Sequence, residues 1–369
     1  MSRVYLDHAS TSPPRPGVVE AMVEWMGAAD PGRVHTEGRM ARVAIEDARD
    51  KVAALLGARS REVVFTSGAT ESVAAAVFGA LSAERGDHVV LPAVEHSCVR
   101  DASARTKQTV VGVDRLGRID PAAAAAAMTD ETALIHCQWG NHEVGTIQPV
   151  ADVVALGRER GVLVHIDAAA AVGHVPIAFD DLGADLMSVS GHKFGGPKGI
   201  GVLLVRRGLR LPPLLLGGDQ ERARRAGLEN VAAIMGLGVA AEHAAASGGE
   251  PAALTQRVLD EATAIDGVSA YGDRAPDGRL PHIACLGVAG VEAEAVLLGL
   301  DQAGIAAHSG SACSSELLEP SPVLEAMGVD AERSLRISTG WSTTAEDIDR
   351  FLAVFPEVVG RLRKLQSSQ

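Results

Sequence analysis

Short apolar runs rich in β-branched residues alternate with alanine-rich stretches along the first two thirds of the chain. The runs that predict buried strands are 62–66, 88–91, 133–138, 162–167, 185–189 and 200–205. The stretches between them that look helical are 72–83, 121–128 and 150–160, with glycine or aspartate near their ends. This alternation predicts an α/β fold with a mostly parallel sheet, in which the strand ends carry the chemistry.

The pattern changes near residue 248, where the sequence reads Gly-Gly-Glu-Pro. A helix is expected from Ala252. The strands expected after it are 282–287 and 334–338. The last helix should begin at Thr343, because Thr343 and Glu346 form a capping-box pair ahead of an apolar face. These features predict a second, smaller layer of structure.

The length of 369 residues fits two domains, and 47% hydrophobic residues is enough for a large buried core. We expect a large domain over 16–248 and a small domain made of 1–15 and 249–369. A formal net charge of -13 provides no basic field for nucleic acid or anionic lipid. The N-terminus has no signal-like apolar region, and no stretch reaches the roughly 18 apolar residues of a membrane span, so a cytoplasmic protein is expected.

The four cysteines lie far apart and lack C-x-x-C spacing. They are Cys98, Cys137, Cys285 and Cys313. Neither a zinc cluster nor a disulfide framework is expected from such spacing, and no metal site is predicted. Each cysteine is therefore a separate thiol whose role depends on its surroundings.

Lys193 follows a predicted strand in the segment Ser190-Gly191-His192-Lys193-Phe194-Gly195-Gly196. A lysine amine becomes a nucleophile toward carbonyls when burial or neighbouring charges disfavour its protonated form. A hydroxyl and an imidazole within three residues of it can bind an adjacent phosphate. Such a segment on its own more often holds a surface lysine, so the interpretation depends on what accompanies it.

Asp167 ends the predicted strand 162–167, about one helical crossover and a returning strand before Lys193. A carboxylate at that place can pair with a pyridinium nitrogen and keep the ring protonated, which lets pyridoxal 5'-phosphate (PLP) act as an electron sink. Alone, a strand-end aspartate is more often a helix N-cap. Together, Lys193 and Asp167 predict a PLP site with the cofactor bound to Lys193 as a Schiff base.

The segment Phe65-Thr66-Ser67-Gly68-Ala69-Thr70-Glu71 leads from a predicted strand through a glycine turn into a helix. The free backbone N–H groups at the positive end of a helix dipole form an anion site. The segment lacks the P-loop and dinucleotide-binding patterns, so nucleotide binding is disfavoured. Thr70 can also serve as a simple N-cap, and the two roles can coexist.

These segments resemble the cysteine desulfurases, PLP-dependent enzymes of fold type I and aminotransferase class V that supply sulfur for iron–sulfur clusters. The matching segments are Tyr5-Leu6-Asp7-His8-Ala9, Thr66-Ser67-Gly68-Ala69-Thr70-Glu71-Ser72, Glu95-His96, Asn141-His142-Glu143-Val144-Gly145, Ser190-Gly191-His192-Lys193, Ser309-Gly310-Ser311-Ala312-Cys313 and Leu318-Glu319-Pro320-Ser321. The resemblance implies a large domain with a mostly parallel seven-stranded sheet flanked by helices. It also implies a smaller C-terminal α/β domain that carries the cysteine loop.

The resemblance implies a role for each matching residue. Lys193 would form the Schiff base with PLP, Asp167 would hold the pyridine nitrogen, and His96 would stack on the ring and assist proton transfers. The residues that would hold the phosphate are Ala69, Thr70, Ser190 and His192. Asn141 and Arg336 match the contacts to the substrate carboxylate, for which an arginine fork is the expected anchor.

Cys313 narrows the implied reaction, because its loop of small residues resembles the longer-loop group with a Ser-Gly-Ser-Ala-Cys sequence. A thiolate there would attack the sulfur of L-cysteine held on PLP. The products would be L-alanine and a persulfide on Cys313. The resemblance further implies that a protein acceptor, a scaffold or a sulfur carrier, receives this sulfur, and that the enzyme is a homodimer.

The sequence departs from the family pattern at two single residues and in one short segment. Ala170 stands where a glutamine commonly hydrogen-bonds the phenolic oxygen of PLP, and Leu228 stands where a threonine usually reaches the PLP phosphate of the neighbouring subunit. Asp30-Pro31-Gly32 replaces a usual Asn-Pro-Ser segment. Losing one hydrogen bond costs on the order of 0.5–1.5 kcal/mol. A divergent paralogue with slower chemistry or a shifted spectrum is therefore expected.

Other class V reactions stay open at this point, namely selenocysteine lyase, β-elimination and aminotransfer. All of them would share Lys193 and Asp167, and Cys313 is the residue that separates them from desulfuration. The alternative outside enzymes is a non-catalytic paralogue that serves as a binding partner, motivated by Ala170 and Leu228. Such a protein would show no visible Schiff-base band after incubation with PLP.

Overall fold

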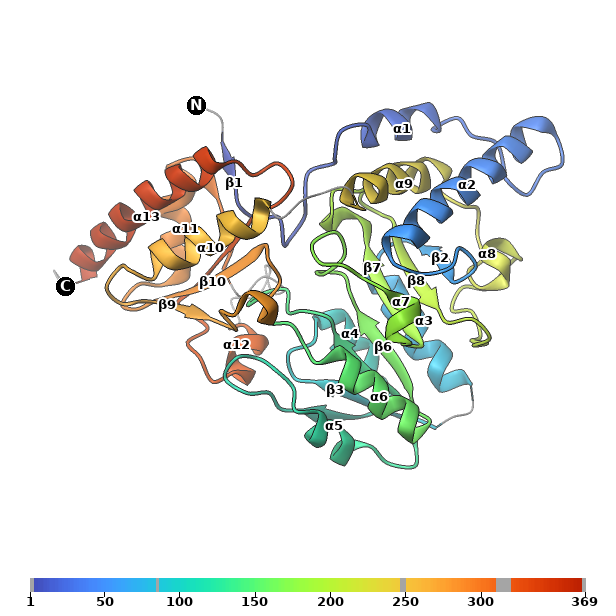
Figure 1. The fold of residues 1–369 in the computed structure, drawn as a ribbon, viewed down its shortest axis with the longest axis horizontal. Helices are drawn as coiled ribbons and strands as arrows, with labels where there is room; N and C mark the ends of the chain where they lie inside the picture. The colour runs from blue at the N-terminus through green and yellow to red at the C-terminus, as the bar shows by residue number, and fades with distance from the viewer. Residues whose placement is uncertain (1–2, 84–85, 246–249, 310–319, 367–369) are drawn as a thin grey trace.

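The computed structural model describes residues 3–83, 86–245, 250–309 and 320–366. In these residues a seven-stranded sheet with the order β2-β8-β7-β6-β5-β3-β4 forms the centre of the larger part of the molecule (Figure 1). Its strands are β2 (Val63–Thr66), β3 (His88–Pro92), β4 (Lys107–Val111), β5 (Thr132–Gln138), β6 (Leu163–Asp167), β7 (Leu186–Ser190) and β8 (Gly201–Val205). Pairing is parallel from β7 to β4, and β8 is antiparallel to both neighbours. The predicted α/β class with a mostly parallel sheet is confirmed.

The apolar runs became strands because both faces of the sheet are covered by helices. Every residue of β5, β6, β7 and β8 is buried, which is typical of strands in a covered parallel sheet. The six predicted strands lie within two residues of their expected bounds. The structure adds β4 at the edge of the sheet, whose mostly exposed residues contain no apolar run from which it could be predicted.

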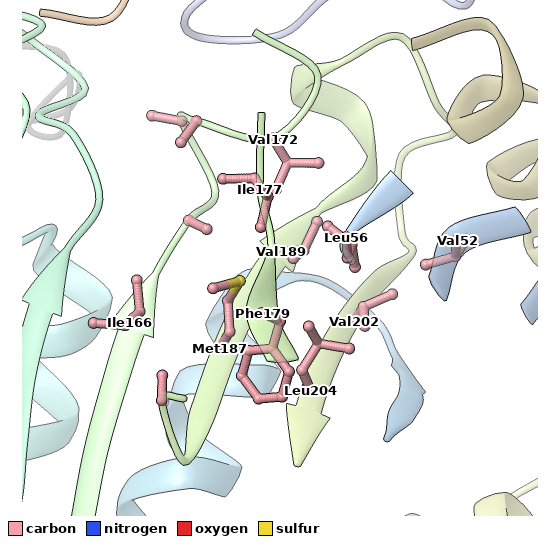
Figure 2. Close-up of a cluster of buried hydrophobic side chains, with 14 of the residues drawn as sticks. Val52, Leu56, Ile166, Val172, Ile177, Phe179, Met187, Val189, Val202 and Leu204 are labelled. Carbon is pink, nitrogen blue, oxygen red and sulfur yellow. The ribbon is translucent and has the colours of Figure 1, made fainter. Parts of the chain in front are cut away.

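Helices pack on the two faces of this sheet. They are α1 (Val18–Glu24), α2 (Thr36–Leu55), α3 (Ala69–Ser82), α4 (Ser97–Ser103), α5 (Pro121–Ala127), α6 (Val150–Arg160), α7 (Phe179–Leu182), α8 (Gln220–Ala223) and α9 (Val231–Ala245). Figure 2 shows Met187 and Val189 of β7 packed in the cluster that contains Leu56, just beyond α2. Leu186, on the opposite face of β7, packs in the cluster that contains Val77 of α3. Alternate residues of one strand therefore hold helices on opposite faces of the sheet.

A smaller sheet with the order β12-β10-β9 packs beside helices in the second part of the molecule (Figure 1). The elements of this part are β1 (Val4–Tyr5), α10 (Glu250–Ala262), β9 (Val268–Tyr271), β10 (Ile283–Val288), α11 (Ala293–Gln302), β11 (Ile305–Ala306), α12 (Pro322–Ala326), β12 (Ser334–Ser338) and α13 (Ala345–Gln366). β1 pairs in parallel with β11, so the beginning of the chain lies in this part. The predicted boundary at 248/249 lies outside the described residues. None of the helices in the described residues is both long and apolar enough to cross a membrane.

The cap of α13 differs from the prediction. The N–H of Asp347 donates to Thr344 Oγ1 over 3.2 Å, and the N–H of Thr344 donates to the Asp347 carboxylate over 2.9 Å. Thr343 Oγ1 instead accepts from the N–H of Gly340 over 2.9 Å. The predicted pair of Thr343 and Glu346 is therefore wrong by one residue, because the preceding turn occupies the Thr343 hydroxyl.

A buried ion pair ties α2 to α8. Both terminal nitrogens of Arg49 donate to the Glu221 carboxylate, over 2.7 and 2.8 Å, and the two side chains are 1% and 2% exposed. The N–H of Phe65 donates to the same carboxylate, and the Arg49 guanidinium lies 4.6 Å from the centre of the Phe65 ring. Glu221, Arg222 and Ala223 have φ of 47°, 58° and 59°, a left-handed conformation that is costly for L-residues. The ion pair therefore holds a strained turn against β2.

We predict that Glu221→Ala lowers the free energy of unfolding by about 3–5 kcal/mol, because it removes the buried carboxylate that pairs with both terminal nitrogens of Arg49 and leaves only the more exposed Glu46 as an acidic partner. Urea unfolding measures the loss. The control is Glu242→Ala, which removes one of the two acidic partners of Lys51, a cation on α2, but at a side chain that is 65% exposed. For this control we expect the free energy of unfolding to fall by less than about 1 kcal/mol. Equal losses in the two variants would contradict the structural role of the buried pair.

Candidate active site

A cavity of about 570 Å³ opens at the carboxyl ends of the central strands. Its wall includes Gln138 at the end of β5, Asp167 at the end of β6 and Ser190 at the end of β7. The predicted site residues that line it are Ala69, Thr70, His96, Asp167, Ser190, His192, Lys193 and Arg336. The predicted nucleophile Cys313 lies outside the described residues.

Asp167 is held in place by its neighbours on the sheet. One carboxylate oxygen, Oδ1, accepts from the Ser188 hydroxyl over 2.8 Å and from the N–H of Ala169 over 3.0 Å. Asp167 and Ser188 are register partners in the parallel pairing of β6 with β7. Sequence reasoning missed Ser188, although a polar residue inside a predicted buried strand was the available signal. The two hydrogen bonds orient the carboxylate toward the cavity before any ligand binds.

The N-terminus of α3 forms another part of the wall. The helix begins at Ala69, three residues earlier than predicted, and its cap residue is Gly68, so no side chain caps its first N–H groups. Thr70 therefore lies in the first turn and is not the N-cap. A side chain on Gly201 of β8 would place its Cβ 2.6 Å from the backbone of Gly68, so glycine is needed where the strand passes under this turn. The uncapped helix end is a suitable anion site.

Lys193 ends a short 3₁₀ turn, η1 (Gly191–Lys193), that directly follows β7. The N-terminal segment fixes this turn, because the N–H of Ser12 donates to the His192 carbonyl and Arg15 Nε donates to the Phe194 carbonyl. The N–H of the His174 ring also reaches the Lys193 carbonyl over 3.4 Å. Burial and the charge of Lys193 lower the pKa of His192 to about 4. The lysine is therefore anchored through its backbone on both sides.

His96 lies between β3 and α4 and caps the helix. Its Nδ1 accepts from the N–H of Cys98 over 3.1 Å, and the Cys98 Sγ lies at the same distance. Since Nδ1 is an acceptor, the ring proton belongs on Nε2. Burial, together with the nearby His142 and Lys193, lowers the pKa of His96 to about 3. His96 therefore presents a neutral imidazole to the cavity.

Arg336 reaches the cavity from β12 and is almost fully buried. One terminal nitrogen donates to Asp7 over 2.8 Å, and the other donates to the His142 carbonyl over 2.9 Å. Its Nε has no hydrogen-bond partner within the part of the chain that the structure describes. The ion pair with Asp7 could not be inferred from the sequence, because the two residues are brought together only by the pairing of distant segments.

Asn141 does not line the cavity. Its Oδ1 accepts from the N–H groups of Glu143 and Val144, and its Nδ2 donates to the Val94 carbonyl. The side chain thus shapes the turn that carries His142, and its contact with a substrate carboxylate stays a prediction. Sequence reasoning missed Cys98, Gln138 and His142 as lining residues. The signal for His142 and Cys98 was their place inside or beside the segments that matched the family.

The departures from the family pattern occupy different places. Ala170 lines the cavity, so a side chain there could reach a bound ligand. Leu228 is 62% exposed and does not line the cavity of this chain.

No three His, Cys, Asp or Glu side chains among the described residues are grouped so that they could hold a metal ion.

Comparison with known proteins places this geometry in a family. The family described as aminotransferase class-V matches residues 4–351. A cysteine desulfurase IscS of Methanosarcina thermophila is 41% identical over 378 residues, which cover 98% of this chain and 93% of the relative. The chain belongs to the cysteine desulfurase family of class-V aminotransferases. The resemblance inferred from the sequence motifs is therefore confirmed.

Solved structures agree with this assignment of the family. A NifS-like protein has a TM-score of 0.90 to this chain at 30% identity, with 98% of this chain and 100% of the other covered. A structure described as SspA in complex with cysteine has a TM-score of 0.81 at 32% identity, with 90% and 98% covered. The fold of cysteine desulfurases thus extends over nearly the whole chain, including the small sheet that supplies Arg336.

We predict that His96 stays neutral, with the proton on Nε2, from about pH 5 to pH 9, because burial holds its pKa near 3. Two-dimensional ¹⁵N NMR of histidine-labelled protein distinguishes the two tautomers and the protonated ring. Cys98→Ala serves as the control, because the backbone N–H at residue 98 still donates to Nδ1. A His96 ring that gains a proton near pH 6.5 would show that the described burial is wrong.

Proposed function

We propose that this chain is a PLP-dependent cysteine desulfurase that converts L-cysteine to L-alanine and takes up the sulfur as a persulfide on Cys313. The observation that carries the proposal is that Lys193, Asp167 and the uncapped N-terminus of α3 line one cavity. The membership of the cysteine desulfurase family supports the same reaction.

The residues around the cavity fit the three functional groups of PLP. The amine of Lys193, which lines the cavity, is the group that would hold the aldehyde. Asp167, oriented by Ser188, suits a protonated pyridine nitrogen. For the phosphate, the free N–H groups of Ala69 and Thr70 are available, with Ser190 and His192 on the same wall. When bound, PLP supplies an electron sink for the negative charge that develops at the substrate Cα.

Three side chains of this protein are assigned the proton transfers, the hydrogen bonding and the binding of the substrate carboxylate. The amine of Lys193 would remove the Cα proton of the substrate and return a proton later. The neutral ring of His96 lines the same cavity, where it would lie against the cofactor ring and offer Nε2–H as a donor. Arg336 would bind the substrate carboxylate, for which its Nε–H is suited because it has no hydrogen-bond partner among the described residues. Asp7 fixes the guanidinium so that it faces the cavity.

The sulfur step would take place between Cys313 and the substrate at the place where the bound cofactor supplies the electron sink. The Cys313 thiolate attacks the Sγ of L-cysteine, a new S–S bond forms and the Cβ–Sγ bond breaks. The electron pair of the broken bond remains on carbon and is protonated, so the products are L-alanine and the Cys313 persulfide. No external oxidant or reductant is required. The family assignment favours this reaction over selenocysteine lyase, β-elimination and aminotransfer.

We further propose that a protein, either a scaffold for cluster assembly or a sulfur carrier, accepts the persulfide sulfur, and that the enzyme acts in the cytoplasm as a homodimer. In the dimer, the exposed Leu228 would approach the phosphate site of the neighbouring subunit. The domain division at 248/249 belongs to the same proposal, with Cys313 and Arg336 on the small domain and Lys193 on the large one.

We expect Cys313→Ser to abolish the cysteine-derived persulfide while leaving the PLP absorption band intact, because the hydroxyl is a poor nucleophile toward sulfur. Mass spectrometry of the protein together with measurement of alanine checks this. Cys98→Ser is the matched control, since Cys98 lines the cavity but is not assigned a role in the reaction. Lys193→Ala should remove the Schiff-base band. Unchanged sulfur release from Cys313→Ser would exclude the persulfide step.

Ala170→Gln should shift the absorption of bound PLP and change the rate by up to about tenfold, because Ala170 lines the cavity and the family pattern implies a glutamine there that would hydrogen-bond the phenolic oxygen. Absorption spectra over a range of pH measure the effect. Leu228→Thr is the companion variant, since residue 228 does not line the cavity of its own chain. A change of spectrum in Leu228→Thr supports a site shared between subunits, whereas identical spectra of Ala170→Gln and the parent protein argue against the assigned place of residue 170.

A further inference from the structure

Two ionisable residues beside the cavity, His142 and Glu143, have no role in the proposed reaction. His142 lines the cavity, and the edge of its ring faces His96, with 5.0 Å between ring centres and 65° between ring planes. The carbonyl of His142 accepts from Arg336 over 2.9 Å. His142 therefore contacts both the residue proposed to stack on the cofactor and the residue proposed to bind the substrate carboxylate.

Glu143 lies behind His142, and its side chain is only 2% exposed. Its Oε1 lies 3.5 Å from His142 Nε2, and its Oε2 accepts from the hydroxyl of Ser321. Ser321 is fully buried and also caps α12, because its Oγ accepts from the N–H of Leu324 over 3.2 Å. A path of polar contacts thus runs from His96 in the cavity through His142 and Glu143 to the start of α12.

The surroundings of Glu143 act on its pKa in opposite directions. Burial raises the pKa of Glu143 to about 7, and the Ser321 hydrogen bond and the positive charges of Arg336 on β12 and Arg100 on α4 oppose this rise. His96 lies on the same side and is neutral, as its lowered pKa requires. Burial likewise keeps His142 neutral by holding its pKa well below the usual range, and keeps the Cys285 thiol on β10 neutral by raising its pKa.

The two protonation states of Glu143 make different contacts. An ionised carboxylate can accept through both oxygens: Oε2 accepts from Ser321, and Oε1 lies 3.5 Å from His142 Nε2 and attracts a proton carried on that nitrogen. A proton on Oε1 turns that oxygen into a donor and removes its attraction for a proton on His142 Nε2, whereas a proton on Oε2 would reverse the hydrogen bond with Ser321 and leave the Ser321 hydroxyl without this acceptor. The 3.5 Å separation from His142 is long for a hydrogen bond, and this is the weaker contact of the two.

We propose that Glu143 is a positioning residue that holds the His142 ring against His96 when its carboxylate is ionised, and releases it when protonated. The inference rests on the proposed function only in that His96 and Arg336 act on the cofactor and the substrate. The sign of the effect follows from the contacts: the ordered arrangement exists above about pH 7 and is lost as the pH falls below it.

The test compares Glu143→Gln with the parent protein. A glutamine amide has one acceptor oxygen, so it reproduces the protonated carboxyl at every pH. In the parent enzyme, the rate of alanine formation from L-cysteine should rise through a limb near pH 7. In Glu143→Gln the limb should be absent and the rate at pH 8 lower by up to about tenfold, the equivalent of one neutral hydrogen bond.

A second readout does not depend on turnover. In histidine-labelled protein without cofactor, the ¹⁵N signals of the His142 ring should shift through pH 7 as Glu143 ionises, and this shift should vanish in Glu143→Gln. The NMR result distinguishes a failure of the proposed function from a failure of the positioning role of Glu143. If the protein makes no alanine but the His142 shift is present, the proposed function fails and the positioning role stands.

Ser321→Ala provides the decisive variant if Glu143→Gln does not fold. It removes a hydrogen bond that lowers the pKa of Glu143, so the limb and the His142 shift should move to higher pH. Ser103→Ala is matched to it, because Ser103 is fully buried and its hydroxyl has no hydrogen-bond partner within the described chain. The proposal is overturned if Ser321→Ala leaves the His142 shift unmoved, or if Ser103→Ala moves it equally.

Discussion

Backbone pairing among β5, β6 and β7 brings Gln138, Asp167 and Ser188 side by side in one register. Because parallel strands end at the same edge of a sheet, residues from three separate segments meet there. The Ser188 hydroxyl and the N–H that follows β6 then orient the Asp167 carboxylate without help from a ligand. Lys193, which follows β7 directly, depends on the same edge for its place in the cavity wall.

The electrostatics of the cavity follow from burial. Imidazoles are numerous near Lys193, yet burial lowers the pKa of His96 to about 3 and of His192 to about 4. Neutral rings can stack on an aromatic cofactor and exchange hydrogen bonds without adding positive charge beside the lysine. Glu143 differs from these histidines, because burial raises its pKa to about 7, so its carboxyl changes charge near neutral pH. Its ionisation changes the contacts that it can make with its neighbours.

How far each feature could be predicted depends on whether its cause is local. The buried strands were predictable, since burial on both faces selects apolar runs, whereas the edge strand β4 required knowledge of its neighbour β3. The cap of α13 was displaced by one residue, because the preceding turn binds the Thr343 hydroxyl. Thr70 was expected as a possible cap, but the glycine turn starts α3 earlier and leaves its N–H groups open.

The sequence by itself determined the α/β class, the family and the identity of the lysine, the strand-end aspartate and the histidine of the site, because each lies in a short segment whose pattern is local. Only the tertiary structure decided that Arg336 pairs with Asp7 and that Ser321 reaches Glu143. These contacts join residues that are distant in the chain. They exist because separately formed elements pack together and bury polar groups, which must then find partners wherever the packing places them.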